Sequence, residues 1–196
     1  MDKAALIEKY RDINVDTDDW YDYIYEDFIA DCEAQGIEVA TQTRSLGKGM
    51  RTTPDITWSG FWSQGDGAAF GGRVDDINKL LGATISIYPM VDKYVNELKG
   101  YYRQSWDTGH NNNMVQYNDY EIEDIELYLG DDHPFTEIWQ EQLEMEMEQV
   151  DEDVRLRVNS LCGDLYRRLE REYEDLTSDE VVWDTIVANE LNNEEK

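Results

Sequence analysis

The sequence predicts an α+β protein with a small antiparallel sheet of about four strands, helices on one face of the sheet, a long C-terminal helix and a final short helix. Two stretches rich in aromatic and β-branched residues flank strong turn signals, which is typical of hairpins. Apolar residues recur at three- and four-residue steps near the N-terminus and throughout a proline-free last third, which is typical of helices. Two hairpins with helices predict a sheet covered on one side.

The first long helix is predicted between residues 18 and 35. Its apolar residues follow helical spacing and would form one buried face: Tyr21, Ile24, Tyr25, Phe28, Ile29 and Cys32. Gly36 stands where a glycine commonly ends a helix. Two shorter helices are predicted over residues 75–81 and 89–98, each followed by a glycine.

The two hairpins are predicted from their strands and turns. In the first, residues 56–63 form a strand, residues 64–67 form a Gly-rich turn, and residues 68–70 return as the partner strand. In the second, residues 101–106 and 114–122 pair across a segment dense in Asp, Gly and Asn. Strand alternation would place Trp58 and Trp62 on the same face of the sheet, which favours a core position for both.

The long helix is predicted from Thr136 to Asp175, about 60 Å at 1.5 Å per residue. A near-heptad apolar row runs along it: Leu143, Met147, Val150, Val154, Val158, Leu161, Leu165 and Leu169. Thr177 and Glu180 fit a capping box that opens a final helix reaching Leu191. The row has two interpretations, a homodimer through the long helix or packing against the apolar residues of the final helix: Val181, Val182, Ile186 and Leu191.

These elements divide the chain into two regions. Residues 1–125 are predicted to form an α+β domain that contains the first hairpin, and residues 126–196 an acidic region of long and terminal helices. The second region would pack on the first or dimerise. Aromatic residues make up 12% of the chain and hydrophobic residues 40%, so we expect a folded core despite the high charge.

The charge balance excludes one class of function. There are 45 Asp and Glu residues against 17 Lys and Arg, giving a formal net charge of −28. Direct nucleic-acid binding is not expected, because phosphate contacts require cationic side chains. Three explanations fit such acidity: solubility in high salt, cation binding, or a polyanion offered to a protein that normally binds nucleic acid.

The localisation expected from the sequence is cytoplasmic. The N-terminal residues lack the basic and apolar regions of a signal peptide, and no apolar run approaches the ~20 residues needed to span a membrane. The two cysteines, Cys32 and Cys162, lie far apart in the sequence and are expected to be reduced, partly buried thiols. No metal site and no membrane partner are predicted.

The strongest charge feature is a stretch without Lys or Arg between Arg103 and Arg155. On the long helix, acidic residues at steps of three and four form one row, with a further one beside it: Glu137, Glu141, Glu144, Glu148, Asp151 and Glu152. Carboxylates four residues apart rise about 6 Å along a helix, and phosphates of one DNA strand are spaced at very roughly 6–7 Å. The row could therefore imitate phosphates; the alternative is the solvated face of an amphipathic helix.

The first hairpin carries a distinctive motif. Its residues are Ser59, Gly60, Phe61, Trp62, Ser63, Gln64, Gly65, Asp66, Gly67 and Phe70. The motif resembles the GFWSQGDGxxF signature of a family of uncharacterised proteins of tailed bacteriophages. The resemblance extends upstream to the Trp20–Asp27 helix and downstream to Tyr101, His110 and Met114. It implies a phage origin and a location in the host cytoplasm, but no activity. The family often has Cys where this chain has Ala69, which argues against thiol chemistry there.

A polar pocket is an alternative site. Gln64, Asp66, Arg103 and His110 would converge if the two hairpins meet, and the QGDG turn could then bind a small molecule or a peptide. A hydrolase using Asp66 and His110 is a weaker alternative. The chain shows no HExxH, phosphate-binding loop or GxSxG motif, so no catalytic residue, cofactor or metal ligand is assigned.

The function expected from these observations is an acidic interaction protein. It would resemble DNA in its charge and block the basic nucleic-acid-binding groove of a host defence enzyme. The carboxylates of the long helix would meet the Lys and Arg residues that normally hold phosphates, without any contact between this chain and nucleic acid.

Overall fold

The computed structural model describes residues 2–17, 19–45, 50–62, 66–92, 105–108, 115–117 and 136–191. The fold is α+β, as predicted, with small antiparallel sheets, several helices, a long C-terminal helix and a short final one. None of the helices within these ranges is both long enough and apolar enough to cross a membrane.

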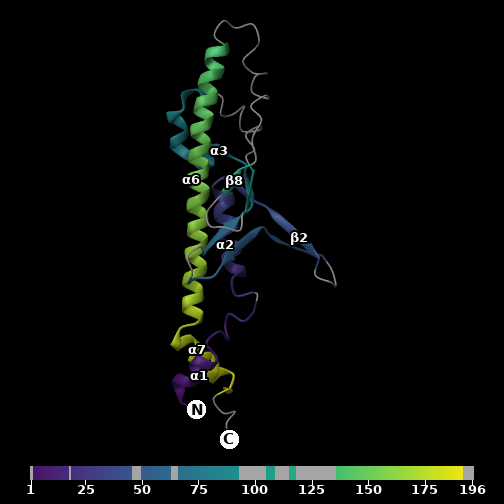
Figure 1. Ribbon diagram of the computed structural model, residues 1–196, viewed down its shortest axis with the longest axis vertical. Coiled ribbons are helices and arrows are strands. Elements are labelled where there is room, and N and C mark those ends of the chain that lie inside the picture. The colour runs from purple at the N-terminus through teal and green to yellow at the C-terminus, as the bar shows by residue number, and fades with distance from the viewer. Residues whose placement is uncertain are drawn as a thin grey trace.

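The long helix α6 (Thr136–Leu176) is the axis around which the other elements are arranged (Figure 1). Its 41 residues correspond to about 60 Å. The short helices α1 (Lys3–Lys9) and α7 (Asp179–Ala188) lie together at its C-terminal end. The α2 helix (Asp22–Ala34) lies beside its middle.

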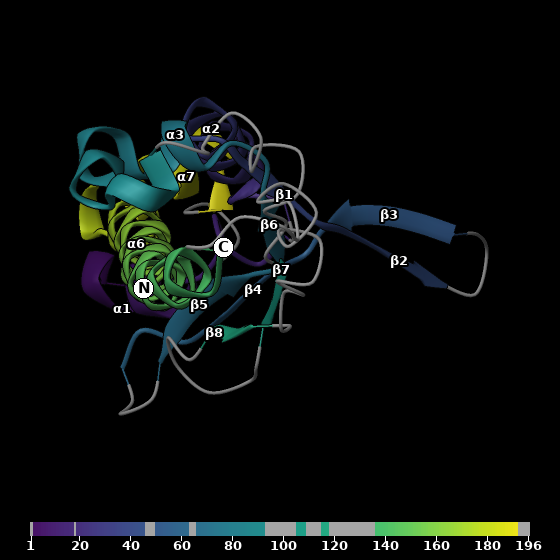
Figure 2. The same cartoon turned by 90° about the horizontal axis from the view of Figure 1, so that it is seen from above.

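The strands form three antiparallel sheets. One has four strands in the order β1-β6-β7-β8, and two have two strands each, β2-β3 and β4-β5. Their bounds are β1 Ile37–Val39, β2 Thr41–Ser45, β3 Met50–Pro54, β4 Ile56–Ser59, β5 Gly67–Phe70, β6 Gly72–Val74, β7 Ser105–Thr108 and β8 Val115–Tyr117. The β2–β3 hairpin projects away from the rest of the molecule (Figures 1 and 2).

Both predicted hairpins are present, although they belong to different sheets and the first strand of the second hairpin extends to Thr108, into the predicted turn. The β4 strand pairs with β5, with Trp58 opposite Ala68, and β7 pairs with β8, with Trp106 opposite Tyr117. The β7–β8 hairpin joins β1 and β6, whereas β4–β5 packs against α6. The β1, β2, β3 and β6 strands were not expected, because they are short or lack alternation of apolar and polar residues.

The main hydrophobic core lies between α6 and the elements that precede it. The near-heptad row of α6 is completely buried there, together with residues of α2, of β5 and of α3 (Ile77–Leu81). Phe28 meets Phe70 edge to face at 5.0 Å between ring centroids in this core. The row is therefore buried within its own chain, and a homodimer through α6, which stays a prediction, would have to use the outer face of the helix.

The expectation that this row packs on the final helix is wrong. The apolar residues of α7 bury themselves against α1 instead, and a second cluster is formed by Leu6, Ile7, Val182 and Ile186. The main core contains residues of both predicted regions, 1–125 and 126–196, while their boundary falls outside the described residues.

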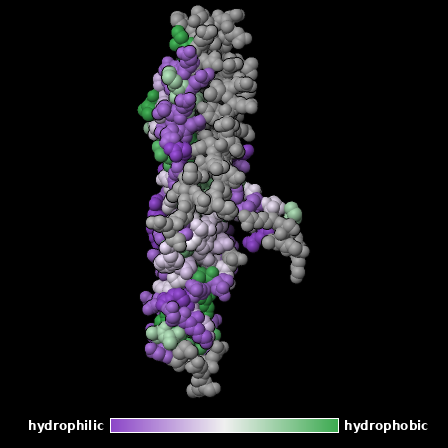
Figure 3. Space-filling model, viewed as in Figure 1, coloured by the Kyte–Doolittle hydropathy of each residue, from purple (hydrophilic) through white to green (hydrophobic). Residues whose placement is uncertain are grey.

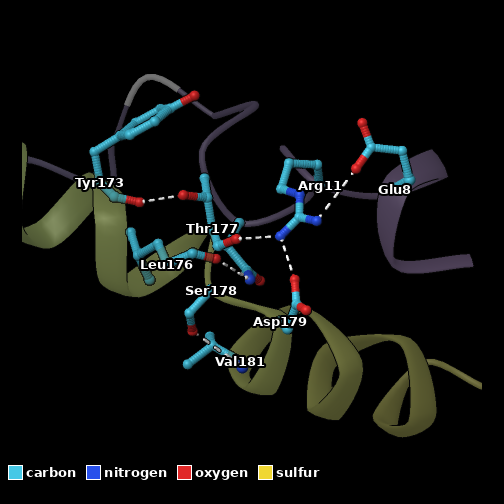
Figure 4. A network of polar contacts seen from close by, with 9 residues as sticks. Glu8, Arg11, Tyr173, Leu176, Thr177, Ser178, Asp179 and Val181 are labelled. Atoms are coloured by element: carbon cyan, nitrogen blue, oxygen red, sulfur yellow. Dashed lines mark hydrogen bonds and ion pairs between the residues drawn. The ribbon is translucent and has the colours of Figure 1, made fainter. Parts of the chain in front are cut away.

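The C-terminal end of α6 is capped by the segment that follows α1 (Figure 4). Arg11 donates hydrogen bonds to the carbonyl of Thr177 at 3.0 Å and to the carboxylate of Asp179 at 2.6 Å. Asn14 donates to the carbonyl of Leu176 at 2.9 Å. These bonds satisfy carbonyls that a helix end leaves without partners. The predicted cap of α7 was one residue off: Ser178, not Thr177, accepts from the backbone of α7.

Two further helical segments complete the layer beside the N-terminal half of α6. After α3, a 3-10 helix (Gly82–Ile87) leads into helical residues 89–92. The predicted helices at 75–81 and 89–98 are thus confirmed as far as residue 92, beyond which the chain leaves the described ranges. This layer brings Tyr88 and its neighbours against α6.

Candidate functional site

The acidic row lies on the side of α6 that does not enter the core. Glu141, Glu144 and Glu148 are exposed, and Asp151 is half-buried. Successive residues turn by about 100°, so steps of three and four keep these carboxylates on one side. In Figure 3 the outer side of the N-terminal half of α6 is mainly hydrophilic.

The carboxylates of this row differ in their partners. Among the residues that the structure describes, no ion pair is formed by Glu141, Glu144 or Glu148. Glu152 is exposed but pairs with Arg155, whose hydrogen bond lowers the pKa of the carboxyl group. The side chain of Glu137 lies outside the described residues.

Two other acidic residues of α6 are structural and lie on the opposite flank of its buried row. Glu146 accepts hydrogen bonds from the backbone N–H groups of Met90 and Val91, at 2.7 and 3.0 Å. Asp153 accepts from the Tyr88 hydroxyl at 2.8 Å. Burial and the bond to Asp153 raise the pKa of Tyr88 to about 12. Not every carboxylate of α6 is therefore available to a partner.

An open groove of about 450 Å³ lies next to the acidic row. It is lined by side chains of α6 and by one tyrosine: Tyr88, Ile138, Glu141, Gln142, Met145, Glu146 and Gln149. Ile138 and Met145 are 60% and 61% exposed, so the groove presents two large apolar side chains to solvent. Sequence reasoning missed this groove, although the seven-residue step from Ile138 to Met145 on the outer face could have indicated it.

The described residues on the two sides of the hairpin turn are bonded to each other and to α6. The carboxylate of Asp66 accepts a hydrogen bond from the backbone N–H of Trp62 at 2.7 Å. A side chain on Gly60 would come within 3.1 Å of that carboxylate, so a glycine leaves room for it. The Tyr166 hydroxyl of α6 donates to the Gly60 carbonyl at 3.1 Å. Asp66 is therefore, first of all, a turn residue.

The predicted core position of Trp62 is wrong. The β4 strand ends at Ser59, because Gly60 and the bond between Asp66 and Trp62 start a turn there. Trp58 is half-buried and stacks on Phe61 at 5.0 Å, whereas Trp62 is 79% exposed. The only ring contact recorded among the described residues for Trp62 is with Tyr173, at 6.3 Å and 72°.

Comparison with known families assigns the greater part of the chain. Residues 20–179 match the model of a domain of unknown function, DUF8835. The chain belongs to this family. The DUF8835 region contains the core, the acidic row and the hairpin motif, whereas α1 precedes it and nearly all of α7 follows it. No match was found among curated proteins, and none among solved structures.

The polar pocket predicted in this DUF8835 domain stays a prediction. Gln64, Arg103 and His110 lie outside the described residues, as do Ser63 and Gly65 of the motif. Asp66 is described and is bound to its own loop. Within the described ranges, no three His, Cys, Asp or Glu side chains are arranged to hold a metal ion.

The two cysteines meet in the core of the DUF8835 domain. Cys32 of α2 and Cys162 of α6 are both buried and close enough to interact electrostatically. Burial raises the pKa of Cys32 to about 12 and that of Cys162 to about 11. Thiols with such pKa values are protonated at neutral pH and are poor nucleophiles.

Proposed function

We propose that this protein is a phage-encoded interaction protein that blocks the basic nucleic-acid-binding groove of a host enzyme, such as a defence nuclease. The observation that supports this function best is the outward row of Glu141, Glu144 and Glu148. Their side chains are exposed, and their carboxylates form no ion pair within the described part of the chain.

The spacing of the row supports mimicry of phosphates. Residues four apart on α6 are separated by about 6 Å along the axis, close to the very roughly 6–7 Å between phosphates along one DNA strand. The helix keeps this spacing because the row on its inner face is packed in the core. A row of Lys and Arg that grips phosphates would meet carboxylates at matching intervals.

The groove beside the row supports a specific protein partner rather than any cation. Charged contacts guide association and exclude wrong partners, whereas affinity depends more on apolar side chains that become buried in the interface. Ile138 and Met145 offer such contacts next to Glu141. The partner surface would therefore combine a basic strip with at least one apolar side chain.

The phage origin rests on the hairpin motif alone. The resemblance of residues 59–70 to a signature of tailed-bacteriophage proteins supports a location in the host cytoplasm and a host protein as the target. Membership of a domain family of unknown function neither favours nor opposes this origin.

The proposal is tested by capture and competition. The immobilised protein is exposed to host lysate at low salt, and bound proteins are released with short duplex DNA and then with salt. We expect duplex DNA to displace the target, because both compete for one groove. The released target, once purified, should lose DNA binding when this protein is added, and regain it as the DNA concentration is raised, because the two compete for one groove.

A matched pair of variants separates the row from bulk charge. Glu141→Gln, Glu144→Gln and Glu148→Gln together remove three charges from the row. Glu26→Gln, Glu33→Gln and Asp184→Asn remove three exposed charges elsewhere. We expect only the first variant to lose the target. Equal capture by both variants, or a target that DNA cannot displace, would refute the proposal.

A further inference from the structure

The Trp62 loop presents an aromatic surface that the row on α6 does not explain. Trp62 is 79% exposed, although tryptophan is among the side chains that gain most from burial. Its backbone is fixed by the Asp66 carboxylate, and its ring stands at 72° to that of Tyr173. The Tyr173 ring therefore borders one side of the exposed indole, and the other side faces solvent.

Three carboxylates act on the backbone of Trp62 or on the tyrosines of this aromatic corner. Asp66 lies at its base, and Glu170 and Asp66 both act on the Tyr166 hydroxyl, where burial and these charges raise its pKa. Asp12 accepts a hydrogen bond from the Tyr173 hydroxyl at 3.4 Å, and burial together with Asp12 raises the pKa of that hydroxyl. These carboxylates place negative charge beside the tyrosines next to Trp62, which favours a cationic over an anionic ligand there.

Three arginines of this part of the molecule are held in ion pairs. Arg167 pairs with Asp164, and Arg168 pairs with Asp31 of α2. Arg11 is held by Asp179 and Glu8 at the end of the helix. Among the described residues, cation–π contacts involve the rings of Trp183 and Tyr10, and none of these three arginines lies over the Trp62 ring.

Another tryptophan of this protein is in contact with a cationic side chain. The ammonium group of Lys3 lies 4.6 Å from the centroid of the Trp183 ring, which is the geometry of a cation–π contact. Trp183 is half-buried beneath α1, whereas Trp62 is almost fully exposed. Within the described ranges, cations lie over Trp183 and Tyr10 and not over Trp62.

We infer that Trp62, flanked by Tyr173 and Asp66, is a binding site for an arginine side chain of a basic partner segment. The guanidinium would stack on the exposed face of the indole, with the surrounding carboxylates accepting its N–H groups. Arginine fits better than lysine, because its planar group stacks and donates hydrogen bonds at the same time. This site is independent of the proposed function: Tyr166 lies 18 residues from Glu148 on α6, about 27 Å along the axis.

The test uses a small probe and a readout specific to the site. A peptide of sequence acetyl-Gly-Arg-Gly-amide is titrated into the full-length protein with ¹⁵N-labelled tryptophan, at a salt concentration that screens weak surface attraction. The indole N–H of Trp62 should shift and saturate, whereas that of Trp183, already covered by Lys3, should not. Matched peptides carry lysine or the neutral isostere citrulline, and we expect binding in the order arginine, lysine, citrulline.

Substitutions at the exposed ring separate a cation site from a merely apolar one. Trp62→Leu keeps apolar bulk but removes the aromatic face, and Trp62→Phe keeps a smaller face. We expect Trp62→Leu, followed at the Tyr173 ring signals, to weaken the arginine peptide by about two- to five-fold, and Trp62→Phe to weaken it less. The variant with Gln at 141, 144 and 148 should bind the peptide as the parent does.

Several outcomes would overturn the inference. They are equal binding of the citrulline and arginine peptides, unchanged binding by Trp62→Leu, and shifts at Trp183 as large as those at Trp62. Loss of site binding in the variant of the α6 row would also overturn it, because the peptide would then be responding to total charge. Failure of the DNA-competition experiment leaves this result untouched, so the two proposals fail separately.

Discussion

Replacing Gly36 with alanine tests how tightly α2 is joined to the sheet. Gly36 follows α2 with a φ of +79°, and a side-chain Cβ there would lie 2.3 Å from the carbonyl oxygen of Asp76. It would also lie 3.0 Å from the Cβ atoms of Asp76 and Lys79. The Gly36 carbonyl accepts hydrogen bonds from the N–H groups of Asp75 and Asp76 at 2.8 and 3.0 Å, so the two segments cannot separate without losing bonds.

The expected cost has two parts. Positive φ in an L-residue costs about 1–3 kcal/mol, and the forced displacement of packed backbone adds about 1–3 kcal/mol. Gly82→Ala is the matched control, because Gly82 has a φ of +54° but nothing within 4 Å of the added atom. It should show the first part alone.

The assay is urea unfolding followed by tryptophan fluorescence. We expect Gly36→Ala to be less stable than Gly82→Ala by roughly 2 kcal/mol, a midpoint difference of about 1 M at a slope near 2 kcal/mol per molar. A Gly36→Ala protein that does not fold, beside a folded Gly82→Ala protein, agrees with the reasoning. Midpoints that coincide would refute it, because the contact with Asp76 would then have no cost.

Two further predictions concern the buried polar groups. Glu146→Ala should cost about 1–2 kcal/mol in unfolding free energy, because charged hydrogen bonds are lost. It should also speed hydrogen exchange at the backbone amides of Met90 and Val91. Glu148→Ala is the control, and equal exchange rates in both variants would contradict a structural role for Glu146. Unfolding free energy should fall as pH rises above 9, since Cys32 and Cys162 ionise near 9 when unfolded but near 12 and 11 when folded. Below pH 9 this contribution to stability is fully present. Urea midpoints at several pH values measure its loss. A protein with both Cys32→Ala and Cys162→Ala should lose less unfolding free energy over the same pH range.

The helices were predictable because their apolar spacing reports burial directly. The row from Leu143 to Leu169 identified both the length of α6 and its buried face. What the row packs against could not be read from spacing, since α2, β5 and α7 all offered apolar residues. The row does not pack on α7, because Leu6 and Ile7 of α1 cover the apolar residues of that helix.

The candidate site was predictable in part. Exposed carboxylates at steps of three and four placed Glu141, Glu144 and Glu148 correctly on the outer side of α6. The structural use of Glu146 was hidden, because it depends on backbone N–H groups more than fifty residues away. Trp62 was misplaced because strand alternation was extended through Gly60, where a bond from Asp66 to the backbone makes a turn.

The cap at the end of α6 has a practical consequence for anyone who shortens this chain. Arg11 and Asn14, which close the helix end, precede residue 20, where the family match begins. A fragment trimmed to residues 20–179 would keep the aromatic and acidic surfaces but would lose both side chains and all of α1. Its last turn would fray. The stability and the binding of the family region are therefore best measured in the whole chain, with its first nineteen residues in place.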